Sequence, residues 1–234
     1  MTFIVAEIGI NWDGDLAIAK KMIESAKACN CDAVKFQSFT ESTVESHPEK
    51  NRLVKASISE DNVKQIDQLA KESKIEWFCT PMYEDAVEIL NPYVNKFKMR
   101  HFDGVELLKN KTTPLLQKIL DTGKNVIIST QDSPENCDFY NHKQIDWLYV
   151  VPKYPCDFID LDFTQLSKFN GYSNHCPHFL APLMASIMGA NIIEVHVTLD
   201  KSGNYIDNPV SFDFQELQYL VELIKKSQLV KTNF

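Results

Sequence analysis

The sequence predicts an α/β protein with a closed (β/α)8 barrel (TIM barrel) as a single domain over residues 1–234. Short apolar runs rich in β-branched residues alternate with longer amphipathic segments from end to end, without a linker. Eight such units in 234 residues approach the roughly 250 residues of a typical barrel. An open doubly wound sheet is disfavoured because the first turn reads GINWDGD and contains no GxGxxG.

Eight strands are expected, each a short apolar run bounded by polar or turn residues. They cover residues 3–10, 32–37, 75–80, 95–99, 125–130, 145–151, 171–173 and 191–199.

Helical patterns separate these strands, and most carry apolar residues on one face. The first is the clearest, because Leu16, Ala19, Met22 and Ile23 fall on one side, and Gly123 and Gly189 occupy positions typical of helix C-caps. We expect helices at 15–29, 60–73, 83–90, 114–122, weakly after Ser133, and at 161–168, 179–188 and 213–226. Residues 51–57 are expected to form a loop.

Charge and composition exclude several classes of partner. The formal charge of −8 has the wrong sign for a chain that binds nucleic acid by neutralising phosphates. Uninterrupted apolar stretches are far shorter than the roughly 20 residues needed to cross a bilayer, and no signal peptide is expected. Six cysteines without a CxxC motif favour free thiols in a reducing compartment. We therefore expect a cytoplasmic protein without a nucleic acid or membrane partner.

Polar side chains recur at spacing two near the ends of the predicted strands, where a barrel collects its reactive groups. The second strand aims Lys35 and Gln37 to one side, and the seventh pairs Ser173 with His175. On the eighth strand, three polar residues share a face: Glu194, His196 and Thr198. Other strands add Glu7, Thr80, Lys98, Ser129 and Thr130.

Two chemistries follow from these residue types. Histidines on neighbouring strands suit a divalent metal ion with open coordination positions, and buried lysines with hydroxyls suit a phosphate or carboxylate. Structural interpretations stay open beside these: Glu7 and Lys35 as an ion pair filling a barrel layer, Lys98 as a surface lysine, and the hydroxyls as helix caps.

Nine ordered motifs resemble the sialic acid synthase family, which includes N-acetylneuraminate, legionaminate and pseudaminate synthases. They run through nearly the whole chain and read AEIGIN, DAVKFQ, FCTPM, FKM, VIISTQDS, KYP, GYSNHC, IIEVHVTLD and YIDNP. The resemblance implies a condensation of phosphoenolpyruvate with the open-chain aldehyde of an N-acyl hexosamine. The products would be a nonulosonic 2-keto acid and inorganic phosphate.

The resemblance also implies roles for individual residues. A divalent ion, Mn²⁺ or Mg²⁺, would be held by His175 and His196. Phosphoenolpyruvate would be held by Lys35, Thr80, Lys98, Ser129 and Ser173. Glu7 and Gln37 would lie beside its reacting end, Glu194 would lie next to the metal, and Tyr154 and Asp207 would contact the sugar.

The sequence departs from the family pattern at several positions. Trp12 replaces a histidine, Gln131 replaces a glycine of the phosphate turn, and His101 occupies a serine position. Members of the family continue into an antifreeze-like domain, which 234 residues do not accommodate, so a homodimer or a separate lid-domain chain is an expected partner. These departures keep two alternatives open: a barrel without turnover that binds or regulates sugar-biosynthesis enzymes, and a metal-dependent aldolase or lyase that does not use phosphoenolpyruvate.

Overall fold

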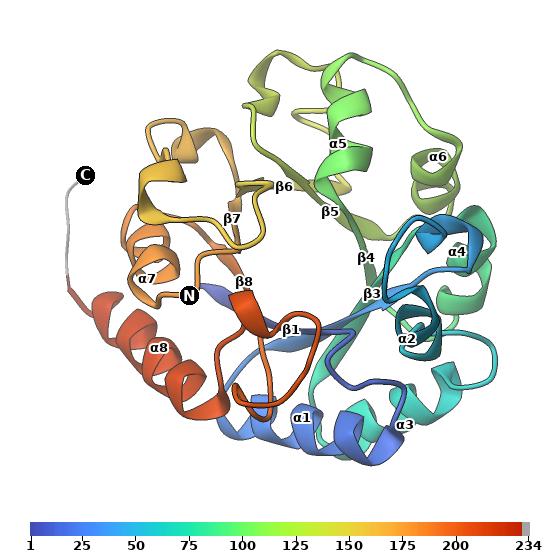
Figure 1. The fold of residues 1–234 in the computed structure, drawn as a ribbon. Coiled ribbons are helices and arrows are strands. Elements are labelled where there is room, and N and C mark those ends of the chain that lie inside the picture. The colour runs from blue at the N-terminus through green and yellow to red at the C-terminus, as the bar shows by residue number, and fades with distance from the viewer. Residues whose placement is uncertain (231–234) are drawn as a thin grey trace.

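The computed structural model describes residues 1–230. Within them, eight parallel strands close into a barrel in sequence order, from β1 to β8 (Figure 1). The predicted (β/α)8 fold is therefore confirmed. The strands are β1 (Phe3–Gly9), β2 (Ala33–Ser38), β3 (Glu76–Pro81), β4 (Lys96–Met99), β5 (Asn125–Thr130), β6 (Ile145–Val150), β7 (Gly171–Asn174) and β8 (Ile192–His196).

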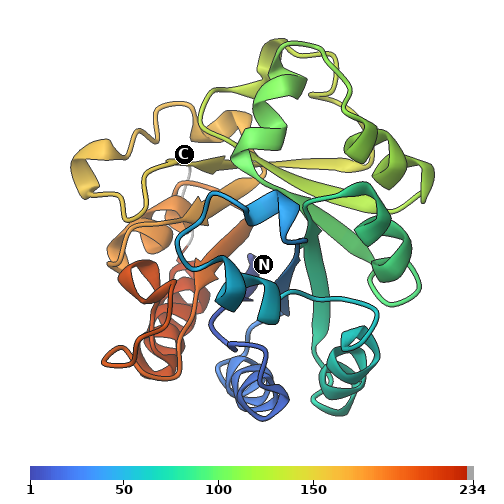
Figure 2. The ribbon, with the colours of Figure 1, turned by 45° about the vertical axis from the view of Figure 1, so that its right-hand side comes forward.

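Helices surround the strands on the outside of the barrel (Figures 1 and 2). Asp15, Thr113 and Asp213 cap three of them, because each side chain accepts hydrogen bonds from backbone N–H groups of the first turn. The helices are α1 (Leu16–Ala28), α2 (Lys50–Lys55), α3 (Val63–Glu72), α4 (Glu84–Leu90), α5 (His101–Leu108), α6 (Pro114–Asp121), α7 (Leu180–Ile187) and α8 (Phe214–Ser227).

The expected helices were wrong at four places. Helix α2 occupies the segment expected to be a loop, and α5 was not expected at all. Conversely, the segment after Ser133 and the segment 161–168 form only the short 3₁₀ turns Pro134–Asn136 and Leu166–Lys168. Short segments such as these bury few residues of their own, so tertiary contacts decide their conformation.

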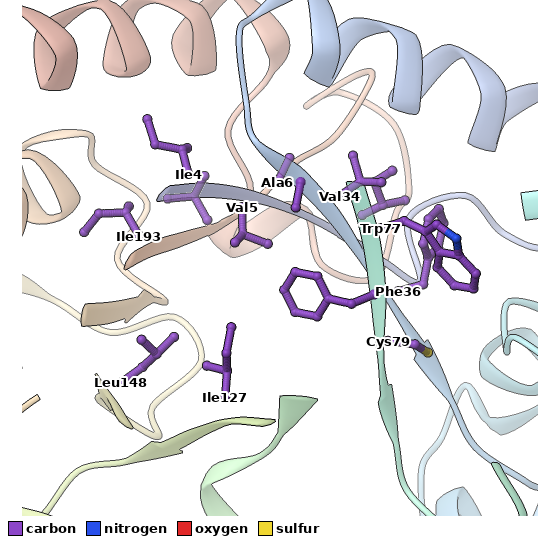
Figure 3. Close-up of a cluster of buried hydrophobic side chains, with 14 of the residues drawn as sticks. Ile4, Val5, Ala6, Val34, Phe36, Trp77, Cys79, Ile127, Leu148 and Ile193 are labelled. Carbon is purple, nitrogen blue, oxygen red and sulfur yellow. The ribbon is translucent and has the colours of Figure 1, made fainter. Parts of the chain in front are cut away.

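Alternation along each strand divides the core in two. In Figure 3, Val5, Ile127 and Leu148 point into the ring of strands, whereas Ile4 and Ile193 point toward the surrounding helices. All five side chains are buried. This alternation carries Lys35 with Gln37 and Glu194 with His196 into the lumen, because residues at spacing two share a face.

Gly9, the last residue of β1, lies close to two carboxylates at the mouth of the barrel. The register between β1 and β2 shifts between Glu7 and Gly9, and Gly9 has a φ of +53°. A Cβ atom at Gly9 would lie 3.0 Å from Asp207 Oδ2 and 3.2 Å from Glu7 Oε1. A residue without a side chain is thus required where these carboxylates face each other.

No helix among residues 1–230 has the length and apolar character needed to cross a membrane.

Candidate active site

A lysine between carboxylates forms the centre of the lumen. Lys35 Nζ lies 2.9 Å from Glu7 Oε1 and 3.7 Å from Glu194 Oε2, and all three side chains are almost fully buried. Lys35 also donates a hydrogen bond to Thr80 Oγ1 at 3.2 Å, and Gln37 Nε2 donates to Glu7 Oε1 at 2.9 Å. Four neighbouring strands therefore bring their polar residues into one connected network.

Lys98 extends this network across the lumen. Its ammonium group donates to Ser129 Oγ at 2.6 Å and to the Met99 carbonyl at 3.0 Å, and it lies 4.0 Å from Glu194 Oε1. Ser173 donates to the same Glu194 oxygen at 2.8 Å. Lys98 is therefore a lumen residue and not the surface lysine that the sequence left open.

Two histidines lie beside each other at the mouth. The rings of His175 and His196 are 5.6 Å apart between centroids, and His175 Nδ1 donates to the Val151 carbonyl at 2.9 Å. His196 Nδ1 lies 3.5 Å from Asp207 Oδ2, and Tyr154 donates its phenolic hydrogen to Asp207 Oδ1 at 2.5 Å. His175 Nδ1 is therefore hydrogen-bonded to a carbonyl oxygen, whereas His196 Nδ1 faces the Asp207 carboxylate at ion-pair distance and the Tyr154 hydroxyl at 3.4 Å.

Burial and charge set the protonation states of the lumen groups. Burial raises the pKa of Glu7 despite the neighbouring Lys35. Burial alone would raise the pKa of Glu194, but Lys35 and Lys98 lower it to about 2. Burial also lowers the pKa of Lys98 to about 8. The lumen therefore contains one firmly ionised carboxylate, Glu194, and one that takes up a proton more readily, Glu7.

The pKa values of the two histidines are shifted in opposite directions. Burial, together with the neighbouring His196, lowers the pKa of His175 to about 4. Burial would also lower the pKa of His196, but the hydrogen bond and charge of Asp207 outweigh it and raise the pKa. A neutral His175 is the form that a metal ion requires.

The residues present fit a divalent metal ion. Because the Nδ1 atoms of His175 and His196 face oxygen atoms, the Nε2 lone pair of each ring stays available to bind a metal ion. Metal-ligating histidines are usually oriented by such a contact at the other ring nitrogen. Glu7 Oε2 and Asp207 Oδ2 are buried oxygens without a hydrogen-bond partner in the described part of the chain. Within residues 1–230, no three His, Cys, Asp or Glu side chains converge into a preformed metal centre, so the predicted metal ligands stay a prediction.

All twelve residues predicted for the site lie at the carboxyl ends of the strands or in the loops that follow them. All twelve take part in the hydrogen bonds and ion pairs given above, and the two histidines also lie beside each other. Thr130, in contrast, does not join this lumen group. Its methyl group lies near Gly104 of α5, and its hydroxyl donates to the Asp132 carbonyl at 3.0 Å.

Sequence reasoning missed Asn11, a buried residue that contacts the site. Its Oδ1 accepts the backbone N–H of Asp207 at 3.1 Å. Asn11 is the last residue of the AEIGIN motif, and this placement was the available signal. Its partners lie more than 180 positions away in the chain, which no local pattern reveals.

Two departures from the family pattern lie outside the lumen network. Trp12 is buried and donates its indole N–H to the Ala56 carbonyl at 2.9 Å, while its ring contacts Phe36 edge to face. Phe36 is on the helix side of β2, so Trp12 belongs to the outer packing. Gln131 is exposed in the loop after β5.

The chain was compared with known proteins. The sequence profile of the NeuB family matches residues 22–233. An uncharacterised protein of Methanocaldococcus jannaschii is 33% identical over 96% of this chain and 70% of its own length. The N,N'-diacetyllegionaminic acid synthase of Legionella pneumophila is 29% identical over 97% of this chain and 72% of its own length.

Solved structures agree with these relatives. The crystal structure of the N-acetylneuraminic acid synthetase of Leptospira borgpetersenii, in complex with citrate, has a TM-score of 0.83 at 26% identity. It covers 97% of this chain, which spans 84% of that structure. A truncated 3-deoxy-D-arabino-heptulosonate 7-phosphate synthase of Thermotoga maritima, at 13% identity and a TM-score of 0.70, shares the fold. The profile match and the sequence relatives together show that the chain belongs to the NeuB family.

Proposed function

We propose that this chain condenses phosphoenolpyruvate with the aldehyde of an N-acyl amino sugar, forming a nonulosonic 2-keto acid and releasing inorganic phosphate. As a member of the NeuB family, it is related to C–C bond-forming synthases of the sialic acid type. The observation that carries the proposal is the two-part site. Lys35 and Lys98 form a cationic floor, and the histidine pair and Asp207 lie at the mouth.

The lysine floor supports binding of a small, highly charged anion. Lys35 has Thr80 as a hydrogen-bond partner, and Lys98 has Ser129, so each ammonium group is held in place beside a hydroxyl. Glu194 alone is firmly ionised between the two lysines, which leaves cationic charge for a carboxylate or a phosphate. In the proposal, Lys35, Thr80, Lys98, Ser129 and Ser173 bind phosphoenolpyruvate.

The reaction forms a bond between the methylene carbon of phosphoenolpyruvate and the aldehyde carbon, whose oxygen takes a proton and becomes a hydroxyl. Water then adds to the former enol carbon. The bond from this carbon to the phosphate oxygen breaks, with the electron pair leaving on phosphate, and the added hydroxyl loses its proton, which gives the ketone and inorganic phosphate. In the proposal, Glu7, whose pKa is raised by burial, accepts a proton from that water, and Gln37 orients its carboxylate by a hydrogen bond.

A divalent ion, Mn²⁺ or Mg²⁺, would be held by His175 and His196, and when bound it would act as a Lewis acid toward the sugar aldehyde. Asp207 and Tyr154 face the same side of the mouth, joined by their 2.5 Å hydrogen bond. In the proposal, they orient the sugar by accepting and donating hydrogen bonds to its hydroxyl or amide groups. The homodimer and the separate lid-domain chain stay predictions.

Incubation with Mn²⁺, phosphoenolpyruvate and a panel of N-acyl hexosamines tests the proposal. The expected result is phosphate release together with a 2-keto acid whose mass equals the sum of acceptor and pyruvate. Lys98→Met should abolish this release. The control is Lys96→Met, because Lys96 lies at the amino end of the same strand, where it pairs with Glu76. This variant should retain phosphate release. No release with any acceptor would contradict the proposed activity.

Crystals soaked with MnCl₂ test the metal ligands separately. Anomalous diffraction at the manganese edge should show a peak within coordination distance of the Nε2 atoms of His175 and His196. A peak elsewhere, or unchanged manganese content in His175→Ala and His196→Ala, would contradict this assignment.

A further inference from the structure

The turn after β1 connects to the loop after β8 through one buried amide. Asn11 Nδ2 donates to the Val197 carbonyl at 2.9 Å and to Ser211 Oγ at 3.1 Å, and Asn11 Oδ1 accepts the backbone N–H of Asp207 at 3.1 Å. Asn11 is 1% exposed, so these three hydrogen bonds are shielded from solvent in the native protein. Three fixed partners around a buried amide determine its position closely.

Ser211 completes a ring of hydrogen bonds around Asp207. Its hydroxyl accepts from Asn11 and donates to the Asp207 carbonyl at 2.7 Å. Both backbone groups of Asp207 are therefore held, the N–H by Asn11 and the carbonyl by the Ser211 hydroxyl and by the backbone N–H of Val210 at 3.1 Å. The result is a single buried anchor for the residue whose carboxylate meets Tyr154 and His196.

The segment leading to Asp207 offers little other support. Residues 200–206 between β8 and Asp207 are exposed or partly exposed. Its exposed hydrogen bonds compete with water, so they fix its position weakly. The position of the Asp207 backbone therefore depends mainly on the buried bonds from Asn11 and Ser211 and on the short turn Asn208–Val210 that follows it.

We propose that Asn11 is a positioning residue for the acceptor sugar: it acts through Asp207, whose N–H it binds directly and whose carbonyl it reaches through Ser211. The inference rests on the proposed function, since it takes Asp207 as a group that faces the acceptor. Asn11 touches no lumen lysine, so it belongs to the acceptor half of the site and not to the phosphoenolpyruvate half. Removal of the Asn11 side chain should therefore change the kinetic constants for the acceptor and leave the KM for phosphoenolpyruvate nearly unchanged.

The test compares Asn11→Ala with Asn62→Ala. Asn62 is a matched control, because its amide also bridges two backbone groups, the Ser57 carbonyl at 2.9 Å and the Ser59 N–H at 3.0 Å. Asn11→Ala should lower kcat/KM for the acceptor by about 100-fold, the cost of a misplacement of about 1 Å. The KM for phosphoenolpyruvate should stay within about twofold, because the lysine floor is untouched. Asn62→Ala should lower stability and leave both constants unchanged.

Crystal structures of the same variants give a readout that needs no turnover. In Asn11→Ala, the Asp207 carboxylate should leave Tyr154 and His196, whereas in Asn62→Ala it should keep both contacts. If Asn11→Ala does not fold, Ser211→Ala removes one hydrogen bond to the Asp207 carbonyl, which keeps its bond from the Val210 N–H, and should show the same effects in smaller size.

The outcomes separate this inference from the proposed function. An unmoved Asp207 in Asn11→Ala, or equal losses for acceptor and phosphoenolpyruvate, would overturn the positioning role while leaving the synthase activity in place. If the wild-type chain releases no phosphate with any acceptor, the proposed function fails. In that case the role of Asn11 toward the acceptor sugar fails as well. A displaced Asp207 in Asn11→Ala would then show only that Asn11 holds Asp207 in place.

Discussion

Lys35 and Lys98 occupy the same lumen, yet their pKa values move in opposite directions. Burial opposes the charge of both groups. Lys35 has Glu7 at 2.9 Å and Glu194 at 3.7 Å, and these charges raise its pKa. Lys98 has its nearest carboxylate at 4.0 Å and otherwise neutral partners, so burial lowers its pKa to about 8. Lys98 is therefore the lysine of the floor that titrates near physiological pH.

Binding of phosphoenolpyruvate should weaken as the pH rises through about 8. Below this pKa Lys98 is an ammonium ion, and above it the group is neutral and no longer attracts the anion. Well above the pKa of the free protein, the Kd should rise by up to about tenfold per pH unit. Isothermal titration calorimetry across this range, in buffers of different ionisation enthalpy, should also detect proton uptake on binding.

The variant Lys98→Met gives the control for this pH dependence. Its affinity should be weak at every pH, without an inflection near the pKa of the lost lysine. An inflection that persists in Lys98→Met would assign the titration to another group.

Removing Lys35 should destabilise the fold strongly, because it leaves Glu7 and Glu194 buried beside each other. Loss of one partner of a buried ion pair costs about 3 to 5 kcal/mol. Lys35→Met should lower the free energy of unfolding by this amount in urea titrations. Adding Glu7→Gln should recover part of it, with a coupling free energy of about 1 kcal/mol or more.

An exposed pair provides the comparison. Lys20 lies 3.9 Å from Glu24 with both side chains in solvent, so Lys20→Met should change stability by less than about 1 kcal/mol. If Lys35→Met and Lys20→Met lower the free energy of unfolding equally, then Lys35 does not stabilise the buried carboxylates Glu7 and Glu194 as argued.

At the scale of residues, alternation along the strands was sufficient to predict which side chains share the lumen. Lys35 with Gln37 and Glu194 with His196 follow from spacing two alone. The contact between Asn11 and Asp207 could not be predicted, because it depends on how two distant loops fold against each other.

At the scale of elements, helix α5 is held against β5 by Gly104. A Cβ atom there would lie 2.6 Å from Thr130 Cγ2 and 2.7 Å from the Ser129 carbonyl. The helix begins directly after β4, so its position is coupled to that of Lys98 and Ser129. A glycine within a helical segment weakens the helix signal, which is one reason why α5 was missed from the sequence.

Gly104→Ala should destabilise the protein although alanine favours helices. Alanine gains up to about 1 kcal/mol in helix propensity, but the clash with the Ser129 backbone should cost about 1 to 3 kcal/mol. Thermal unfolding should show the net loss, and affinity for phosphoenolpyruvate should fall as α5 moves away. Phe102→Ala, a change on the same helix at a side chain that is 75% exposed, should leave affinity unaltered. A Gly104→Ala protein with wild-type stability and affinity would contradict the close approach.

The strong helices were predicted correctly for an identifiable reason. Helices α1 and α8 begin at Asp15 and Asp213 caps and carry regular apolar faces, so sequence and tertiary structure agree. The segment 161–168 has apolar residues at helical spacing, but it forms only a 3₁₀ turn because Tyr149 Oη and other loop contacts fix its backbone.

At the scale of the whole molecule, the closed barrel places all six cysteines in buried positions as free thiols. Burial raises the pKa of every one of them. Because the thiolate is the reactive form, the native protein should show no fast-reacting thiol with an aromatic disulfide reagent, and all six should react in urea. A fast-reacting thiol in the native protein would mean that part of the barrel opens readily.

Closure joins the two ends of the sequence in one site. Strand β1 pairs with β8 through Phe3 with Ile192 and Glu7 with His196, and Asn11 reaches Asp207 beyond β8. A chain emerging from a ribosome therefore carries Glu7 long before it carries His196 and Asp207. Nascent protein cannot assemble the mouth of the barrel until translation has passed Asp207, so ligand recognition begins only after that residue has been added to the chain.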